Sequence, residues 1–156
     1  MFVCKDKHQN TVALQELERR LEEYYNGKAS TEYYCAAQSA NEEWSPTSSH
    51  GILLSLLKDG DTVLDLGCGT GVVAQQARAK KIKYTGIDWS NTAIETAKSK
   101  FSEKTGDAID VNFIRGSIYE TGIENKSFDV VTSLFVIEHL TRPEKFINEA
   151  MRMVRT

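Results

Sequence analysis

Apolar residues recur along the chain with two different spacings, and these spacings predict where helices and strands lie. Between residues 11 and 26 the spacing is three or four residues, as in an amphipathic helix, and the apolar positions are Leu14, Leu17, Leu21 and Tyr24. Gly27 suits the position just beyond a helix end. A second helix is expected to begin at Ser45 and Pro46, an N-cap followed by proline in the first turn, and to run to about Leu57. Its apolar face is expected to pack against other apolar groups and consists of Ile52, Leu53, Leu56 and Leu57.

Four short apolar runs follow, and each is typical of a β-strand. They lie at 63–66, 84–88, 111–115 and within 125–134. Helical spacing separates them: one helix reaches about Lys80, one begins near Asn91, and the last begins at a capping box over 141–144. The fourth run alternates too little to be half exposed, so both of its faces should be covered. Strands that alternate with helices predict a parallel sheet with right-handed crossovers, which is an α/β fold.

The first strand runs directly into a loop with glycine at every second position: Gly67, Gly69 and Gly71. Glycine permits a positive φ and lets a ligand approach the main chain where a Cβ would collide. Val72 stands where the dinucleotide fingerprint has its next glycine, and no Lys-Ser or Lys-Thr pair follows Gly71 as it would in a P-loop. The loop therefore predicts close contact with a ligand, while both of these nucleotide motifs are incomplete.

Asp88 ends the second strand, 21 positions after Gly67. An acid at this distance and at a strand tip meets the two hydroxyls of a bound ribose. The alternative is an N-cap for the next helix, a role that Ser90 already fits. Trp89 can cover one face of an adenine ring, or it is an exposed or core tryptophan. Ribose and adenine occur in nicotinamide cofactors and in S-adenosylmethionine, so these residues do not separate the two.

Composition and charge narrow the class of protein. A chain of 156 residues with 40% hydrophobic and 26% charged residues is ordinary for one soluble domain. The net charge of -3 comes with basic residues scattered among acids, so no nucleic-acid partner is expected. The chain shows neither a signal peptide nor an apolar run of the roughly 20 residues that span a membrane, which predicts a cytoplasmic protein. Cys4, Cys35 and Cys68 include no Cys-x-x-Cys pair, which argues against disulfides and a zinc site.

Residues 65–71, Asp-Leu-Gly-Cys-Gly-Thr-Gly, resemble the first motif of the class I S-adenosylmethionine-dependent methyltransferases. The resemblance extends from about Gly51 to the end of the chain. It implies a Rossmann-like parallel sheet of order 3-2-1-4 with helices on both faces. It also implies one domain over 1–156, with an N-terminal helical cap segment at 1–60 and a cofactor-binding core at 61–156. The family sheet has seven strands, so its C-terminal part is expected to be missing, and a second copy or a partner chain would cover the exposed edge of the fourth strand.

The resemblance also implies which residues bind S-adenosylmethionine as the cofactor. These positions are Asp65, Gly67, Cys68, Gly69, Asp88, Trp89, Ser117, Ile118 and Leu134. Asp65 and the backbone of Leu134 would face the amino end of the methionine part, with a loop-stapling role as the alternative for Asp65. The family has Gly-Asp after its third strand, where the carboxylate accepts from the adenine amine. This chain has Gly116-Ser117, so stacking and the Ile118 backbone would hold more of the adenine.

The implied reaction is transfer of a methyl group to a small-molecule acceptor by in-line displacement, in which positioning supplies most of the rate. His139, beside Glu138, is the candidate to take a proton from the acceptor, with capping or packing as its alternative role. Family members that bind a divalent metal carry Glu-x-x-Glu-His at this point, but Phe135 replaces the first acid, so no metal is expected. Three earlier aromatic residues resemble a substrate-side lid or else pack half-buried: Tyr33, Tyr34 and Trp44.

Two other functions stay open at this point. A truncated module would bind the cofactor and need a partner chain or a second copy for activity. A nicotinamide-dependent enzyme would use the same ribose-binding acid. The residue pattern does not predict the acceptor, because the substrate wall would lie in the N-terminal aromatic segment and in the strands that are missing.

Overall fold

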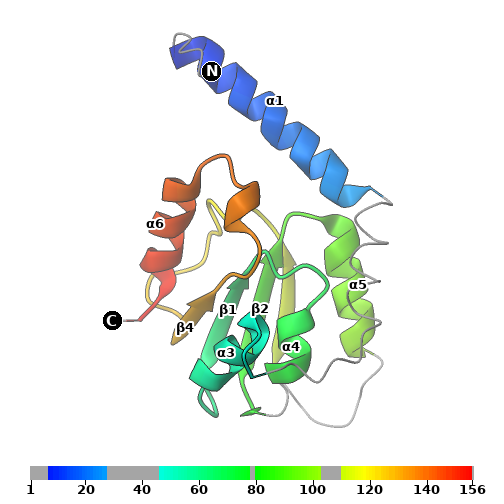
Figure 1. The fold of residues 1–156 in the computed structure, drawn as a ribbon, viewed down its shortest axis with the longest axis vertical. Helices are drawn as coiled ribbons and strands as arrows, with labels where there is room; N and C mark the ends of the chain where they lie inside the picture. The colour runs from blue at the N-terminus through cyan, green and yellow to red at the C-terminus, as the bar shows by residue number, and fades with distance from the viewer. Residues whose placement is uncertain (1–6, 28–45, 78–79, 103–109, 156) are drawn as a thin grey trace.

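The computed structural model describes residues 7–27, 46–77, 80–102 and 110–155. Its centre is a sheet of four parallel strands in the order β3-β2-β1-β4 (Figure 1). The strands are β1 (Thr62–Leu66), β2 (Lys83–Asp88), β3 (Val111–Arg115) and β4 (Val130–Thr132). The observed order and direction confirm the parallel α/β fold that the alternation of strands and helices predicts.

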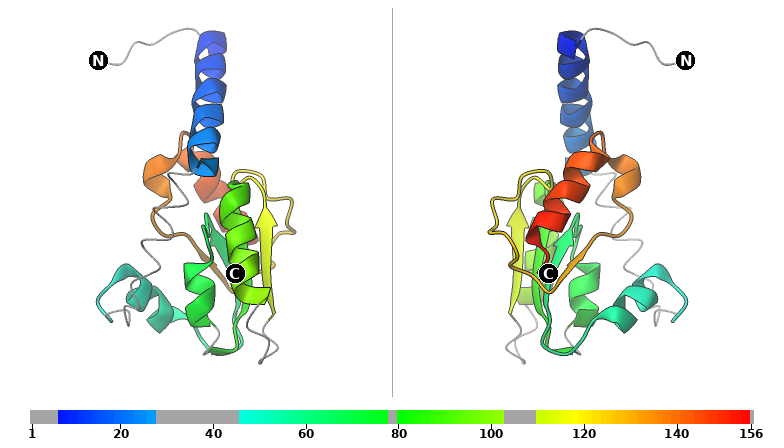
Figure 2. Two further views of the ribbon diagram at one scale, coloured as in Figure 1. Left: turned by 90° about the vertical axis from the view of Figure 1, so that its right-hand side faces the viewer. Right: turned by 90° about the vertical axis from the view of Figure 1, so that its left-hand side faces the viewer.

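Helices surround this sheet. In chain order they are α1 (Lys7–Asn26), α3 (Ser49–Leu56), α4 (Val72–Ala77), α5 (Asn91–Ser102), the short 3-10 helix η2 (Ile137–His139) and α6 (Pro143–Met153). On one face α3, α4 and α5 pack around Val63, Tyr84 and Phe113 of the strands. On the other face, α6 packs Phe146 and Met153 against strand residues. Figure 2 shows α5 toward the viewer from one side of the sheet and α6 from the opposite side.

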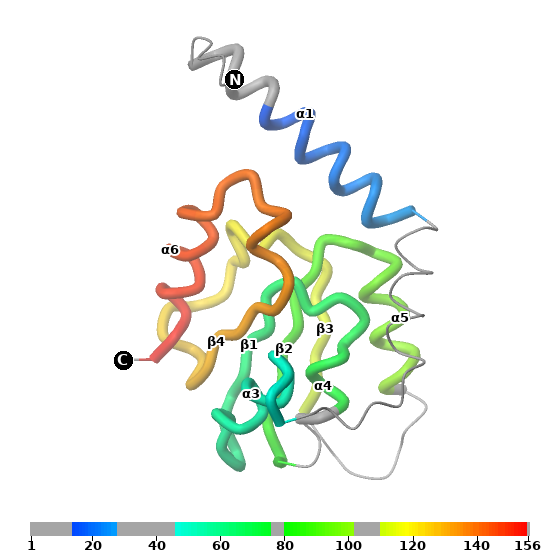
Figure 3. Tube along the Cα trace, in the orientation of Figure 1, coloured from blue at the N-terminus to red at the C-terminus, as the bar shows by residue number. Residues whose placement is uncertain are grey.

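Helix α1 lies beyond the carboxyl ends of the strands and extends away from the sheet (Figure 3). The predicted helix is confirmed, but its apolar positions Leu14, Leu17 and Tyr24 are 38%, 47% and 61% exposed. Its last turn is held by α5, because Asn26 Oδ1 accepts a hydrogen bond of 2.8 Å from the N–H of Asn91. Neither α1 nor any other helix in the described segments is long and apolar enough to cross a membrane.

The start of α3 differs from the prediction. Its N-cap is Ser48, whose hydroxyl accepts a hydrogen bond of 3.1 Å from the N–H of Gly51. Pro46 lies in the turn before the helix, and Ser45 lies outside the described residues. The helix therefore begins at Ser49, because a serine closer to the apolar segment supplies the cap.

The apolar face of α3 is only half buried. Leu53 and Leu57 lie in the core, whereas Ile52 and Leu56 are exposed. The helix that follows the glycine loop is described over Val72–Ala77, and its expected end near Lys80 is separated from it by residues outside the described ranges.

The predicted capping box at the start of α6 is wrong. The N-cap is Arg142, which makes no side-chain cap hydrogen bond, and Pro143 occupies the first turn. Thr141 lies one residue too early to cap the helix. Its hydroxyl instead donates a hydrogen bond of 2.6 Å to Glu18 of α1. A contact between distant segments has therefore replaced the local one.

Ser90 is expected to stabilise the fold at the junction of α1 and α5. Its buried hydroxyl donates to the Tyr25 carbonyl at 2.9 Å and accepts from the N–H of Ala93 at 3.2 Å. We expect Ser90→Ala to lower the free energy of unfolding by about 1–2 kcal/mol, because it removes a helix cap and leaves the partly buried Tyr25 carbonyl without this donor. Urea denaturation measures the change. The exposed Ser55→Ala is the control and should change stability by less than about 0.5 kcal/mol; equal effects would contradict the prediction.

Candidate functional site

The glycine loop joins β1 to α4 at the carboxyl end of the sheet. Gly67, Gly69 and Gly71 have φ values of +78°, +52° and +80°, which favour glycine strongly over residues with a Cβ. The N–H groups of Gly67 and Cys68 both donate to the Ile87 carbonyl, at 2.8 and 3.0 Å. The loop is thus fixed to the end of β2.

Two side chains of this loop are buried. The Cys68 thiol packs in the core on the side of α4, and burial raises its pKa well above its usual value. A nucleophilic role does not suit a thiol in this state. The Thr70 hydroxyl is also buried and has no hydrogen-bond partner within the part of the chain that the structure describes. A polar atom left unpaired beside the glycines fits a loop built to receive a polar ligand.

Asp88 connects the loop with the start of α5. One carboxyl oxygen accepts a hydrogen bond of 3.0 Å from the N–H of Gly69, and the other accepts one of 2.9 Å from Ser90. Burial raises the pKa of Asp88, whereas these backbone hydrogen bonds lower it. A carboxylate has about four acceptor sites, so Asp88 can hold the loop and still accept from ligand hydroxyls. This geometry is compatible with the role of acid at the strand tip, whereas the N-cap of α5 is Ser90 and not Asp88.

Asp65 is the penultimate residue of the inner strand β1 and is 2% exposed. The Tyr84 hydroxyl donates a hydrogen bond of 2.6 Å to its carboxylate. Burial raises the pKa of Asp65 to about 7, and the Tyr84 hydrogen bond opposes that shift. Near neutral pH, the protonation state of Asp65 therefore depends on any charge that comes close to it.

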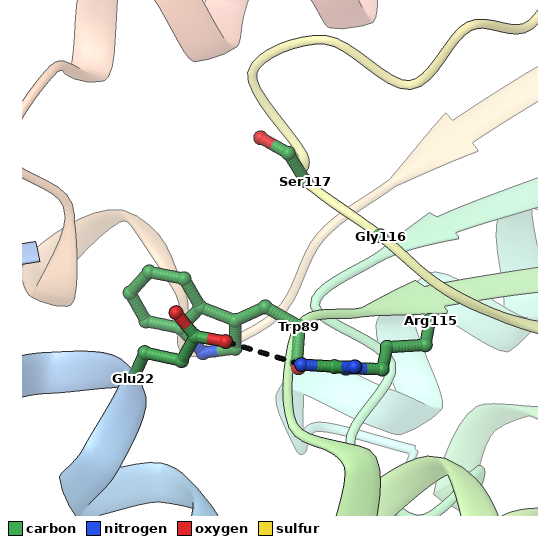
Figure 4. A pocket seen from close by; sticks show the side chains of 5 residues that line it. All are labelled: Glu22, Trp89, Arg115, Gly116 and Ser117. Carbon is green, nitrogen blue, oxygen red and sulfur yellow. Dashed lines mark hydrogen bonds and ion pairs between the residues drawn. The ribbon is translucent and has the colours of Figure 1, made fainter. Parts of the chain in front are cut away.

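Trp89 borders a pocket of about 300 Å³ at the carboxyl ends of β2 and β3 (Figure 4). The pocket is lined by Glu22, Trp89, Arg115, Gly116 and Ser117. Three of these positions follow the ends of the two strands, and Glu22 comes from α1. An aromatic ring with several polar groups around it suits a flat heterocyclic base.

Ser117 and Ile118 follow β3 as expected. The Ser117 hydroxyl accepts a hydrogen bond of 3.1 Å from the N–H of Tyr119. The side chain of Ile118 packs against the core under α6. The backbone N–H of Tyr119 thus already donates to the Ser117 hydroxyl, which was expected to help bind the adenine base.

The segment after β4 carries the candidate catalytic residues. Ser133 ties it to the sheet by donating 2.8 Å to the Leu66 carbonyl, and Leu134 packs against the core. Phe135 has a φ of +57° and an exposed ring 5.6 Å from that of His50. Such a conformation is costly for a bulky residue and is concentrated at functional sites. Glu138 and His139 follow in η2, both exposed.

Tyr25 brings His139 and Trp89 into one aromatic group. Its ring centroid lies 6.1 Å from that of Trp89 and 5.7 Å from that of His139. Glu18, two turns earlier in α1, accepts two hydrogen bonds of 2.9 Å from Arg142. Glu18, Glu22 and Tyr25 are not predicted as site residues by the sequence, because there they only repeat the polar and aromatic pattern of an amphipathic helix.

The lid candidates Tyr33, Tyr34 and Trp44 lie outside the described residues. Within the described ranges, no three His, Cys, Asp or Glu side chains are grouped so that they could hold a metal ion.

Comparison with protein families gives a match that includes the glycine loop, Asp88 and Trp89 but not the residues of α1. The family model described as "Methyltransferase domain" matches residues 64–156. A similar protein is the ubiquinone biosynthesis O-methyltransferase of Nitrosomonas europaea, which is 33% identical over 95 residues, covering 61% of this chain and 40% of that one. The chain thus spans 40% of the length of this relative.

Two solved structures from Haemonchus contortus share the fold. Phosphoethanolamine N-methyltransferase 2 in complex with S-adenosyl-L-methionine gives a TM-score of 0.70 at 22% identity, over 86% of this chain and 33% of that one. The same enzyme with phosphomonomethylethanolamine and S-adenosylhomocysteine gives a TM-score of 0.60 at 25% identity, over 66% of this chain and 24% of that one.

Proposed function

The chain belongs to the methyltransferase domain family, and from this premise we propose that it binds S-adenosylmethionine and transfers the methyl group to a hydroxyl of a small molecule. The observation that carries the proposal is the position of Asp88. Its carboxylate holds the glycine loop through Gly69, and the next residue, Trp89, borders the pocket at the end of β3. An acid suited to accept from ribose hydroxyls, a glycine loop that a ligand can approach closely and an aromatic ring for stacking are therefore adjacent. An adenosyl group requires this combination.

The residues present fit the proposed cofactor. The unpaired Thr70 hydroxyl and the positive φ angles of the glycines support a loop that receives a polar ligand. S-adenosylmethionine supplies an activated methyl group on a sulfonium that is a good leaving group. Asp88 would accept from the ribose hydroxyls, Trp89 would stack on the adenine, and Asp65 would face the ammonium of the methionine part.

The acceptor and its proton need groups on the other side of the site. The name of the Nitrosomonas europaea relative, an O-methyltransferase, supports oxygen as the methylated atom. An acceptor hydroxyl loses its proton as the new bond forms, and a histidine suits that transfer near neutral pH. We assign this role to exposed His139, with Glu138 beside it and Tyr25 packed against its ring.

Calorimetric titration with S-adenosylhomocysteine, and separately with NAD, tests the cofactor. Binding of S-adenosylhomocysteine with no heat from NAD is expected, and tighter binding of NAD would overturn the proposal. Methyl transfer from labelled S-adenosylmethionine to a panel of small hydroxyl compounds tests the reaction. Solution mass measured in the same samples tests the alternative of a module that needs another chain, since turnover by a monomer would exclude that need.

Trp89→Leu is expected to lower the affinity for S-adenosylhomocysteine about tenfold, because stacking of a base on an aromatic ring contributes about 1–3 kcal/mol. Calorimetry measures the loss. Trp89→Phe keeps a ring in place and should retain most of the affinity. If both variants bound S-adenosylhomocysteine as tightly as the wild type, Trp89 would not be part of the binding site.

A further inference from the structure

The pocket beside Trp89 contains a charged hydrogen-bond acceptor that comes from a distant part of the chain. Glu22 reaches the pocket from α1, and its carboxylate accepts a long hydrogen bond of 3.3 Å from Arg115 Nη2 (Figure 4). Arg115 also donates 3.3 Å to the Trp89 carbonyl. The Ser117 hydroxyl is already engaged by a backbone N–H. Glu22 is therefore the strongest acceptor that the pocket offers to a ligand.

The position of Glu22 is fixed by its neighbours on the helix. Glu18, Glu22 and Asn26 are spaced four residues apart, so they lie on one face of α1. Glu18 accepts hydrogen bonds from Arg142 and Thr141, and Asn26 accepts from the N–H of Asn91. Glu22 lies between these two docking points, so this face of α1 is held over the ends of the strands with the carboxylate at the pocket.

We infer that Glu22 is a specificity-determining residue that accepts a hydrogen bond from the amino edge of a purine base lying against Trp89. This inference rests on the proposed function and names the chemistry that its base pocket selects. A carboxylate accepts hydrogen bonds and cannot donate them when ionised. It therefore favours adenine, whose edge carries an amine donor, over hypoxanthine, which has a carbonyl oxygen at that position. Base recognition consequently depends on the docking of α1.

Glu22→Gln tests the inference in the full chain, since the amide keeps the shape and can donate as well as accept. The probes are S-adenosylhomocysteine and its S-inosyl analogue, in which hypoxanthine replaces adenine. Because hydrogen bonds to charged groups are worth about a factor of ten or more in affinity, we expect the wild type to prefer the adenine compound at least about tenfold. In Glu22→Gln this preference should fall about tenfold, through weaker binding of the first compound and not of the second.

Two variants separate the carboxylate from other effects. Glu23→Gln removes the next acid, which pairs with Arg19 on the exposed side of α1, and should keep the wild-type preference. Arg115→Ala removes the ion pair and a hydrogen-bond donor of the pocket but leaves the carboxylate, so the preference for the adenine compound should not fall. Loss of preference in Arg115→Ala equal to that in Glu22→Gln would overturn the inference. An unchanged preference in Glu22→Gln would also overturn the inference but would leave the proposed function intact. A wild type that binds neither compound would overturn the proposed function itself.

Discussion

Gly67→Ala is expected to lower the free energy of unfolding by about 3 kcal/mol and to abolish measurable binding of S-adenosylhomocysteine. Two costs add. The residue has a φ of +78°, where a residue with a Cβ loses about 1–2 kcal/mol. The new methyl group would also overlap Val136 Cγ2 and lie 3.2 Å from its Cγ1, and overpacking of this kind costs about 1–3 kcal/mol. Urea denaturation measures the first effect and calorimetry the second.

Two further variants separate these costs. Gly60 has a φ of +84°, and an added Cβ there would meet nothing within 4 Å. Gly60→Ala should therefore show the conformational cost alone, about 1 kcal/mol, with cofactor binding unchanged. Adding Val136→Ala to Gly67→Ala should recover about 1–2 kcal/mol relative to the sum of the single changes, since the overlapping methyl groups are gone. If the two changes in unfolding free energy simply add, contact with Val136 is not the cause of the lost stability.

The sheet was predictable from the sequence because its signals are local. Each strand is a short apolar run, each crossover begins after a turn, and right-handed crossovers leave few possible orders. The glycine loop and Asp88 were predictable for the same reason, since a fixed spacing along one β-α-β unit determines their proximity. Ser90 likewise caps α5 as its position suggested, because a cap depends on residues three positions apart.

The parts that were not predictable depend on contacts between distant segments. Thr141 has the residue type and spacing of a helix cap, yet Glu18 of α1 takes its hydroxyl. Glu22 reaches a pocket whose other lining residues come from positions 89 and 115–117. Tyr25 joins Trp89 to His139. Periodicity predicts which residues share a face of α1, but the direction of that face is decided only when the helix packs.

The same contacts connect the two halves of the proposed site. Tyr25 and Glu22 belong to one helical turn of α1, and they contact the aromatic group and the base pocket respectively. A change in the docking of α1 would therefore alter cofactor recognition and the surroundings of His139 together. Helix α1 is therefore part of the proposed site. Its amphipathic sequence does not indicate this role, and several of its apolar residues are exposed in the structure.

Asp65→Asn is expected to stabilise the folded chain at pH 8 by about 2–4 kcal/mol while weakening its binding of S-adenosylhomocysteine. Burial raises the pKa of Asp65 to about 7, from 3.8 in a free carboxyl group, so the folded state binds an additional proton between these values. The stability that this proton gives is complete below about pH 4 and is lost as the pH rises through 7, at about 1.4 kcal/mol per pH unit. Asparagine stays neutral and avoids that loss.

Urea denaturation of both proteins from pH 4 to pH 8 measures the effect as a difference in unfolding free energy. The difference should be near zero at pH 4 and largest at pH 8, and a constant difference would contradict the assigned cause. Tyr84→Phe supplies the opposite test, since it removes the hydroxyl that donates to Asp65. It should lower stability most at pH 8, where the carboxylate is charged and then lacks this donor. If Asp65 faces the cofactor ammonium, bound S-adenosylhomocysteine should offset part of the cost of the buried charge, so the stability gain in Asp65→Asn should shrink when ligand is present.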